Sequence, residues 1–165
     1  MRSTKLTKLP KDQIGPFWEL FRWSLANSLP AGVRFTETLA TNLLAAVTVG
    51  DFEAWIAYNC PDENLMRPDQ VTPVGTVITV ISSDPISMDK VLVIYSMYGF
   101  GHNPTLPWLK CINILKKYAK SQGCRSVMAY TDKANVLKIA EYVKFSWQTM
   151  VLEMDLSVED QKQCL

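Results

Sequence analysis

The single histidine of the chain lies in a glycine-rich turn, where a catalytic or binding residue could act. His102 follows Gly99, Phe100 and Gly101 and precedes Asn103, directly after an apolar run that is expected to be a buried strand. Ligands of α/β proteins bind preferentially at the carboxyl ends of strands, so His102 is a candidate acid–base group. Histidine and asparagine also occur commonly in turns, which leaves a purely structural role open.

Aromatic residues gather in the sequence around the same turn. Tyr95 and Tyr98 stand near the end of the apolar run, and Phe100 and Trp108 lie just beyond it. Such rings could line a pocket for a small molecule, form a hot spot for a protein partner or cap the hydrophobic core. The sequence leaves these three interpretations open.

A helix expected upstream, at residues 16–28, is apolar on more than one side. Its main stripe has helical spacing, but Trp18 and Trp23 lie off that stripe. A deeply packed helix explains this pattern, and so does an interface on the second side. The second explanation predicts a protein partner or neighbouring subunit that docks on Trp18, Trp23 and the chain termini.

Composition excludes several classes of protein. The chain has 17 basic and 16 acidic residues, a net charge of +1, whereas nucleic-acid-binding proteins usually carry a basic excess. No run of about 20 apolar residues predicts a membrane-spanning helix. Four cysteines without a C-x-x-C spacing, beside one histidine, predict neither a metal site nor a redox pair. The start of the sequence lacks the apolar segment of a secretory signal, so we expect a cytoplasmic protein with reduced thiols.

The elements that would position these residues follow from hydrophobic periodicity. Expected helices lie at 16–28, 34–47, 106–121 and 133–143, and expected strands at 52–58, 74–81, 91–98, 125–131 and 149–156. At 165 residues the chain has room for one domain. We predict an α/β (α+β) domain over residues 14–156, between a basic N-terminal arm at 1–13 and a polar C-terminal tail at 157–165. The arm is either solvated or docked on a partner.

A motif near the end of the chain carries a resemblance to a known family. It begins at Asn135, has Lys138 at its alanine position, and reaches Tyr142 seven residues after its start, with Ser-Trp in place of the closing Gly-Phe pair. This pattern, N-x-x-A-x-x-x-Y-x-x-x-G-F, is similar to that of the GNAT superfamily of N-acetyltransferases. The order of elements resembles the family over residues 50–156, and the motifs support it over 109–156. The resemblance implies a GNAT-like mixed, mainly antiparallel central sheet flanked by helices.

The resemblance also implies a binding site for acetyl-CoA before the long helix. The family motif R/Q-x-x-G-x-G/A, which holds a pyrophosphate on backbone N–H groups and a helix N-terminus, falls on residues 103–108. Asn103 takes its arginine position, and Leu106 and Trp108 take its two glycine positions, so the loop is degenerate. If the family motif is aligned in a shifted register, Gly99-Phe100-Gly101 forms the phosphate-binding turn instead. The implied cofactor-binding residues are Tyr98, Gly99, Phe100, Gly101, Asn103, Trp108 and Asn135.

The chemistry implied by the resemblance is direct acyl transfer to an amine. A base takes the amine proton, and an acid protonates the departing thiolate. Tyr142 occupies the acid position, with a phenol whose ordinary pKa is near 10, although a packing role would also explain it. The expected central strand at 91–98 offers no carboxylate, so Glu53 and His102 are the candidate bases.

A second interpretation is a GNAT-fold protein that has lost catalysis and serves as a structural or interaction subunit, for example in a bacteriophage particle. The degenerate loop, the missing base and the two-sided helix favour it, whereas the order of elements and Tyr142 favour the acetyltransferase. Nucleic-acid binding through the lysines of 106–121 is the least favoured interpretation, because the net charge is close to zero.

Overall fold

A mixed five-stranded sheet forms the centre of the structure, a computed structural model that describes residues 3–30, 32–60, 72–100, 105–131 and 140–141. The elements are β1 (Ser3–Lys8), the short 3-10 helix η1 (Lys11–Gln13), α1 (Ile14–Ser28), α2 (Glu37–Val49), β2 (Phe52–Cys60), β3 (Thr72–Ser83), β4 (Lys90–Gly99), α3 (Thr105–Ser121) and β5 (Cys124–Ala129). The strands follow chain order across the sheet. Neighbours are antiparallel except for β4 and β5, which are parallel and joined by the crossover helix α3. This is the mixed, mainly antiparallel α/β architecture expected from the sequence.

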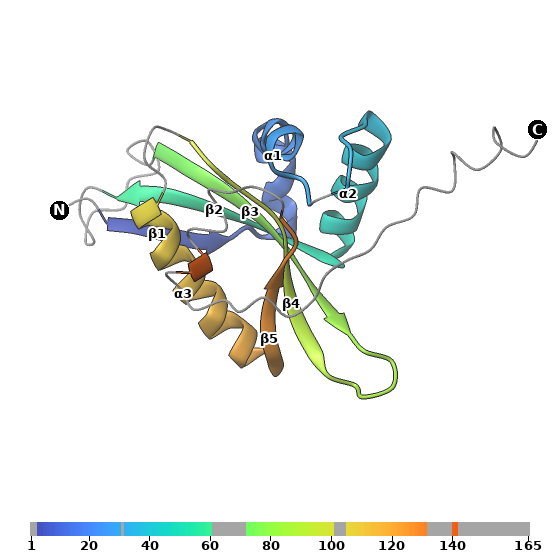
Figure 1. Cartoon of the computed structure of the whole chain (residues 1–165). Helices are drawn as coiled ribbons and strands as arrows, with labels where there is room; N and C mark the ends of the chain where they lie inside the picture. Colours follow the sequence, from blue (N-terminus) through green and yellow to red (C-terminus); the bar gives the residue numbers. More distant parts are fainter. Residues whose placement is uncertain (1–2, 31, 61–71, 101–104, 132–139, 142–165) are drawn as a thin grey trace, which may run out of the picture.

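The sheet separates two layers of helices. Helices α1 and α2 cover one face, and α3 covers the other (Figure 1). Successive side chains of a strand point to opposite faces, so Ala54 and Ile56 of β2 pack with α1 and α2, whereas Trp55 and Ala57 pack with α3. Each face therefore has its own hydrophobic cluster, and every strand position belongs to one side or the other.

Strand β1 lies within residues 1–13, for which the sequence predicts a basic arm. It pairs with β2 in a continuous register from Ser3↔Cys60 to Lys8↔Trp55. Leu6 is its one buried apolar side chain and belongs to the cluster under α3. A single apolar residue among polar neighbours gives no recognisable alternation, so the strand cannot be predicted from hydrophobic pattern.

Both ends of α2 are closed by local contacts. At the start, the Thr36 hydroxyl accepts a hydrogen bond of 3.0 Å from the Leu39 N–H, the usual N-cap arrangement. At the end, Gly50 takes a left-handed conformation with φ of 95°, which glycine adopts without strain. The Lys11 ammonium donates a hydrogen bond to the Val49 carbonyl and opposes the negative end of the helix dipole. These contacts fix α2, and with it the β2 strand that follows.

The remaining described helices and strands lie close to their expected places. The expected helix at 133–143, strand at 149–156 and tail at 157–165 fall outside the described residues, apart from Ala140 and Glu141, which are helical. Among the helices that the structure describes, none is long and apolar enough to cross a membrane.

Candidate functional site

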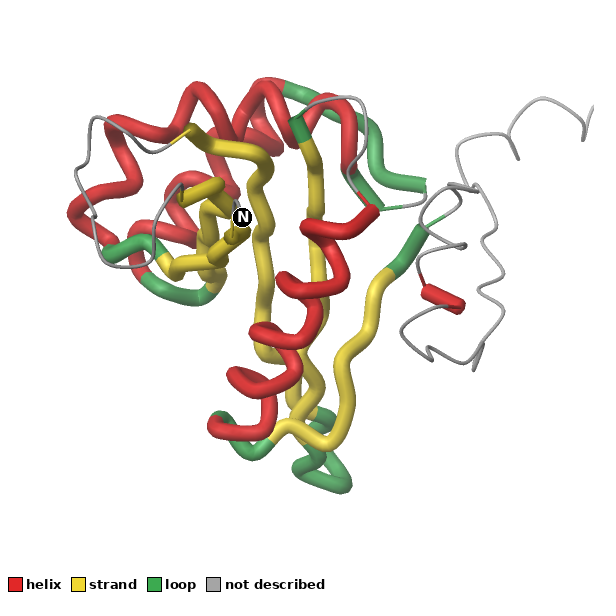
Figure 2. Tube along the Cα trace, turned by 90° about the vertical axis from the view of Figure 1, so that its left-hand side faces the viewer, coloured by secondary structure: helices red, strands yellow, loops and turns green. Residues whose placement is uncertain are grey.

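The parallel strands β4 and β5 are paired along only part of β4. Their pairing runs from Lys90↔Cys124 to Ile94↔Ala129, and β4 then continues to Gly99. Figure 2 shows β5 diverging from β4 beyond this point, with the first turn of α3 beside the opening. The N–H and C=O groups on an unpaired strand edge can bind an extended ligand. Within the described part of the chain, the second half of β4 offers such an edge on its β5 side.

A β-bulge marks the place where the two strands separate. The register between β3 and β4 shifts there, so that Tyr95 is an extra residue without a partner on β3. As a result Tyr95 and Ser96 both face α1 and α2. The Tyr95 ring lies 5.4 Å from the Phe52 ring, and burial raises the pKa of its phenol. The Ser96 hydroxyl lies 2.6 Å from the Ser28 hydroxyl of α1. Hydrophobic pattern does not predict this bulge, because Ser96 is the one polar residue between Val91 and Tyr98 and both faces of the run are otherwise apolar or aromatic.

Helix α3 begins beside the same opening. The first N–H groups of a helix have no partner within the helix and carry the positive end of its dipole. The helix starts at Thr105, and Pro107 in its first turn has no N–H. The Thr105 and Leu106 N–H groups are therefore the donors that the described first turn offers to an anionic group.

Trp108 at the start of α3 directs its indole into the core. Its side chain is only 4 % exposed and belongs to the cluster under α3. The indole lies directly on Gly75 of β3: a Cβ at position 75 would sit 2.8 Å from Cη2 of Trp108 and 2.7 Å from the Tyr98 carbonyl oxygen. The tryptophan at a glycine position of the family pattern is thus accommodated by a glycine on the sheet, and its indole packs against that glycine. A direct contact of Trp108 with a cofactor remains a prediction.

Glu53, a predicted catalytic base, lies in a polar network under α3. Its carboxylate accepts hydrogen bonds from the Lys8 ammonium at 3.1 Å, the Tyr118 hydroxyl, and the Thr79 hydroxyl at 3.4 Å. The Tyr118 ring packs edge-on against Trp55, with centroids 4.9 Å apart. Burial raises the pKa of Tyr118, and the Glu53 carboxylate raises it further. Burial alone would lower the pKa of Lys8, but the hydrogen bond and charge of Glu53 outweigh it and raise that pKa.

This network lies far from the opening between β4 and β5. Glu53 lies on β2, two strands from β4, which is about 10 Å across the sheet. Tyr118 lies near the other end of α3 from Thr105, about 20 Å along the helix. The geometry therefore gives Glu53 a structural role, joining β1, β2, β3 and α3, and the predicted role as a base gains no support from it.

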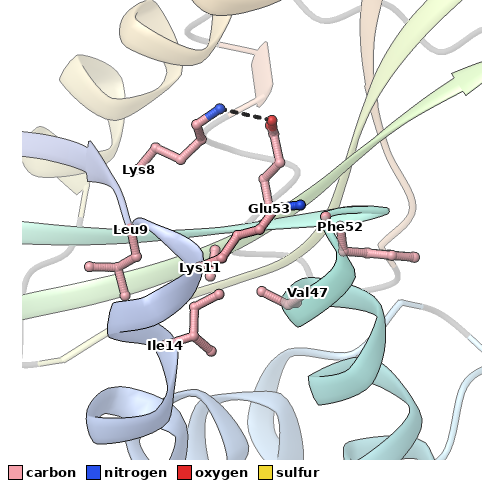
Figure 3. A pocket seen from close by; sticks show the side chains of 9 residues that line it. Lys8, Leu9, Lys11, Ile14, Val47, Phe52 and Glu53 are labelled. Atoms are coloured by element: carbon pink, nitrogen blue, oxygen red, sulfur yellow. Dashed lines mark hydrogen bonds and ion pairs between the residues drawn. The ribbon is translucent and has the colours of Figure 1, made fainter.

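A small pocket adjoins Glu53 on the side of α2 (Figure 3). It is lined by Lys8, Leu9, Lys11, Ile14, Val47, Gly50, Phe52, Glu53 and Ala54. Its volume is about 70 Å³, far below the 300–1,000 Å³ that is usual for ligand sites. Both lysine ammonium groups are already engaged, one by Glu53 and the other by the Val49 carbonyl. The pocket has room for a few water molecules and not for a nucleotide cofactor.

An open group of three aromatic rings lies on the α1 side of the end of β4. The Trp23 ring lies 5.1 Å from Tyr98 and 5.7 Å from Phe100, and the latter two are 5.7 Å apart. Trp23 is 53 % exposed, whereas Trp18 is 9 % exposed and packs against Phe21 in the core. The two tryptophans predicted to share one surface are therefore separated, and Trp23 instead joins two residues predicted to bind the cofactor.

Gly101, His102, Asn103, Asn135 and Tyr142 lie outside the described residues, so their roles as turn, cofactor-binding or catalytic residues stay predictions. Among the described residues, no group of three or more metal-ligating side chains is positioned to hold a metal ion.

Comparison with known proteins identifies the fold. No family model matches the sequence, and no curated protein matches it. Solved structures do match in three dimensions. A probable acetyltransferase is 12 % identical with a TM-score of 0.66, over 92 % of this chain and 98 % of its own.

Two further structures were solved with CoA ligands. AAC(6')-Iy in complex with the bisubstrate analogue CoA-S-monomethyl-acetylneamine is 14 % identical with a TM-score of 0.64, over 93 % of this chain and 97 % of its own. A predicted acetyltransferase from Clostridium acetobutylicum with acetyl-CoA is 13 % identical with a TM-score of 0.64, over 94 % of this chain and 97 % of its own. These likenesses extend over nearly the whole of each chain, and they confirm the resemblance found in the sequence: this protein has the fold of the GNAT acetyltransferases.

Proposed function

We propose that this protein is an N-acetyltransferase that transfers an acetyl group from acetyl-CoA to an amine. The observation that carries the proposal is the second half of β4, which within the described residues has no partner on its β5 side and lies beside the N-terminus of α3. An extended, amide-bearing chain with an anionic end fits this combination of strand edge and helix terminus. Structures with the same fold that hold acetyl-CoA or a CoA analogue support the assignment of the ligand.

The residues present fit the cofactor in chemical terms. The Thr105 and Leu106 N–H groups would hold the pyrophosphate, and the N–H and C=O groups of Met97 and Gly99 would bind the amides of the pantetheine arm. When bound, acetyl-CoA supplies an acetyl thioester, which is activated toward attack by an amine. Tyr142, at the family's acid position, is proposed to protonate the departing thiolate.

Ligand-induced stabilisation tests the cofactor site. A ligand present at about 100 times its dissociation constant adds about 2.7 kcal/mol, which raises the melting temperature of a chain of this size by roughly 5–10 °C. We expect this rise with acetyl-CoA and with coenzyme A, and not with ATP. The absence of any rise with millimolar acetyl-CoA would overturn the proposal.

A charged variant at the helix start localises the site. Thr105→Glu adds a carboxylate beside the proposed pyrophosphate, although a carboxylate at this position stabilises the helix itself. We expect acetyl-CoA to bind about tenfold more weakly, a loss of about 1.4 kcal/mol, without a fall in the melting temperature of the free protein. Thr105→Gln, of the same size but neutral, is the matched control and should bind like the wild type. Equal affinities of the two variants would place the cofactor elsewhere.

Turnover distinguishes an active enzyme from a subunit that has only kept the fold. Release of free thiol from acetyl-CoA in the presence of a primary amine, with loss of that activity in Tyr142→Phe, would support catalysis. Tight cofactor binding without thiol release across a panel of amines would instead support the non-catalytic interpretation.

A further inference from the structure

The three rings of Trp23, Tyr98 and Phe100, named here the aromatic triad, are not part of the hydrophobic core. None of them belongs to the cluster on either face of the sheet. Their centroids are 5.1 to 5.7 Å apart, in edge-on and tilted arrangements, which are favourable geometries for aromatic pairs. Trp23 nevertheless remains 53 % exposed. The triad is thus an ordered aromatic surface that still has ring area to offer.

Rigid elements hold the triad in place. Trp23 lies in α1, and Tyr98 lies on β4 opposite Thr76 of β3. The Phe100 N–H donates a hydrogen bond of 2.8 Å to the Val74 carbonyl, so the chain is still fixed to the sheet one residue after β4 ends. Rings held in this way lose little conformational freedom when a ligand binds.

The triad adjoins the half of β4 where the proposed function places the pantetheine arm, which carries the acetyl thioester at its end. Tyr98 follows the bulge at Tyr95 by three residues and lies beyond the last pairing with β5, at Ile94. Its ring points to the α1 side, where it meets Trp23. An acceptor amine that rests on the triad would therefore approach β4 from the α1 face.

Arg22 and Glu19, the charged residues of α1 near Trp23, are already engaged in ion pairs. Arg22, the residue before Trp23, is held by the Glu37 carboxylate through two hydrogen bonds and by Glu19 at 3.6 Å. The surface presented by the triad itself is made of neutral rings. The faces of aromatic rings attract an ammonium group, and their edges and faces pack well against another aromatic ring. A ligand with both features, an amine on an aromatic skeleton, gains from both interactions.

We propose that the acceptor is a primary arylalkylamine and that the aromatic triad is its binding surface, with Trp23 as the main specificity-determining residue. This inference rests on the proposed acetyltransferase function for its place in a reaction, but not for the binding itself. A polyhydroxylated acceptor with several ammonium groups fits the triad less well, because the carboxylates described near Trp23, those of Glu19 and Glu37, are paired with Arg22.

Calorimetric titration of the purified protein tests the proposal without requiring turnover. The probes are phenethylamine and 2-cyclohexylethylamine, which carry the same ammonium group and differ only in the aromaticity of the ring. We expect phenethylamine to bind about fivefold to tenfold more tightly. Trp23→Leu should weaken phenethylamine binding about tenfold, through loss of both the ring–ring and the ring–ammonium interaction. It should weaken cyclohexylethylamine binding by less, since only the ring–ammonium interaction is lost there, and leave the thermal shift with acetyl-CoA nearly unchanged.

Phe17→Leu is the matched control, since Phe17 is another partly exposed aromatic residue of α1 that is not in the triad. It should bind both amines like the wild type, and Phe100→Leu provides a second variant within the triad. Equal binding of the two amines, or equal effects of Trp23→Leu and Phe17→Leu, would overturn the proposal. Selective phenethylamine binding without any response to acetyl-CoA would support the triad as an amine-binding surface and refute the proposed acetyltransferase function. Failure of the inference and failure of the proposed function are therefore distinguishable.

Discussion

The contact between Gly75 and Trp108 allows a quantitative test of how the start of α3 is positioned. Adding one methyl group in Gly75→Ala would place it 2.7 Å from the Tyr98 carbonyl oxygen and 2.8 and 3.0 Å from two carbons of the Trp108 indole. All of these are at or below the closest approach that real Cβ atoms make. The Tyr98 carbonyl belongs to the backbone of the sheet and cannot rotate away from the new methyl group. The indole contact, in contrast, can be removed by a second substitution at Trp108.

The expected losses in the free energy of unfolding follow from these contacts. Overpacking a well-filled core costs about 1–3 kcal/mol, and the carbonyl contact places Gly75→Ala in the upper part of that range, at about 2–3 kcal/mol. Trp108→Phe removes the distal ring atoms and leaves a partial cavity, with a cost of about 2 kcal/mol. If the two changes were independent, the double variant would lose about 4–5 kcal/mol. Because a phenylalanine ring at position 108 does not fill the space that the new methyl group needs, we expect the double variant to lose only about 3 kcal/mol.

Urea denaturation followed by far-ultraviolet circular dichroism would measure the four free energies of unfolding in this cycle. Circular dichroism is preferable to tryptophan fluorescence, since one substitution removes a tryptophan. The expected coupling is about 1–2 kcal/mol in favour of the double variant, well above the roughly 0.5 kcal/mol within which independent substitutions add. Additive losses would show that the indole does not press on Gly75, and the account of how α3 is seated on the sheet would then be refuted.

Two further predictions concern groups whose pKa is raised. The hydrogen bond from Tyr118 to Glu53 contributes stability that is complete below the ordinary tyrosine pKa of 10.0 and is lost as the pH rises through the higher pKa of the folded state. The difference in melting temperature between the wild type and Tyr118→Phe should therefore be constant up to about pH 9 and shrink in more alkaline buffer. A difference that grows with pH would contradict this hydrogen-bond network. Burial raises the pKa of Cys111 to about 12, so its thiol stays protonated and shielded: peptide mapping after iodoacetamide treatment should find Cys111 unmodified in the native protein and modified in urea, and rapid labelling of the native protein would show that α3 is less firmly packed.

The order of elements was predictable because long amphipathic helices and apolar strands leave a strong periodic signal. Helix α3 is an example, since its buried Trp108, Ile112 and Leu115 repeat at helical spacing. Strand β1 left no such signal, because Leu6 is its one apolar side chain in the core and pairing with β2 decides its conformation. The Tyr95 bulge was hidden for the opposite reason: apart from Ser96, the residues around it are apolar or aromatic on both faces, so a change of face hardly alters the pattern.

The composition of the candidate site was predictable only in part. The run of glycine and aromatic residues at the end of β4 predicted a site there, and the structure places Tyr98 and Phe100 at this strand end. Sequence spacing could not show that Trp23 joins them from α1, since that contact depends on how α1 crosses the sheet. Nor could it show that Glu53 is occupied by Lys8 and Tyr118, because those partners lie 45 and 65 residues away.

Strand β1 also determines when the fold can close during synthesis. Leu6 pairs opposite Ala57 of β2, and Lys8 contacts Tyr118 across 110 residues of sequence. Strand β1 therefore has no partner until β2 has left the ribosome. Because contacts between distant parts of a chain form slowly, the growing chain must carry β1 unpaired until β2 has emerged, and the apolar cluster around Leu6 stays uncovered until α3 has followed. Nascent chains stalled before α3 should accordingly bind chaperones through this segment, and that binding should cease once residues up to Ser121 have left the ribosome.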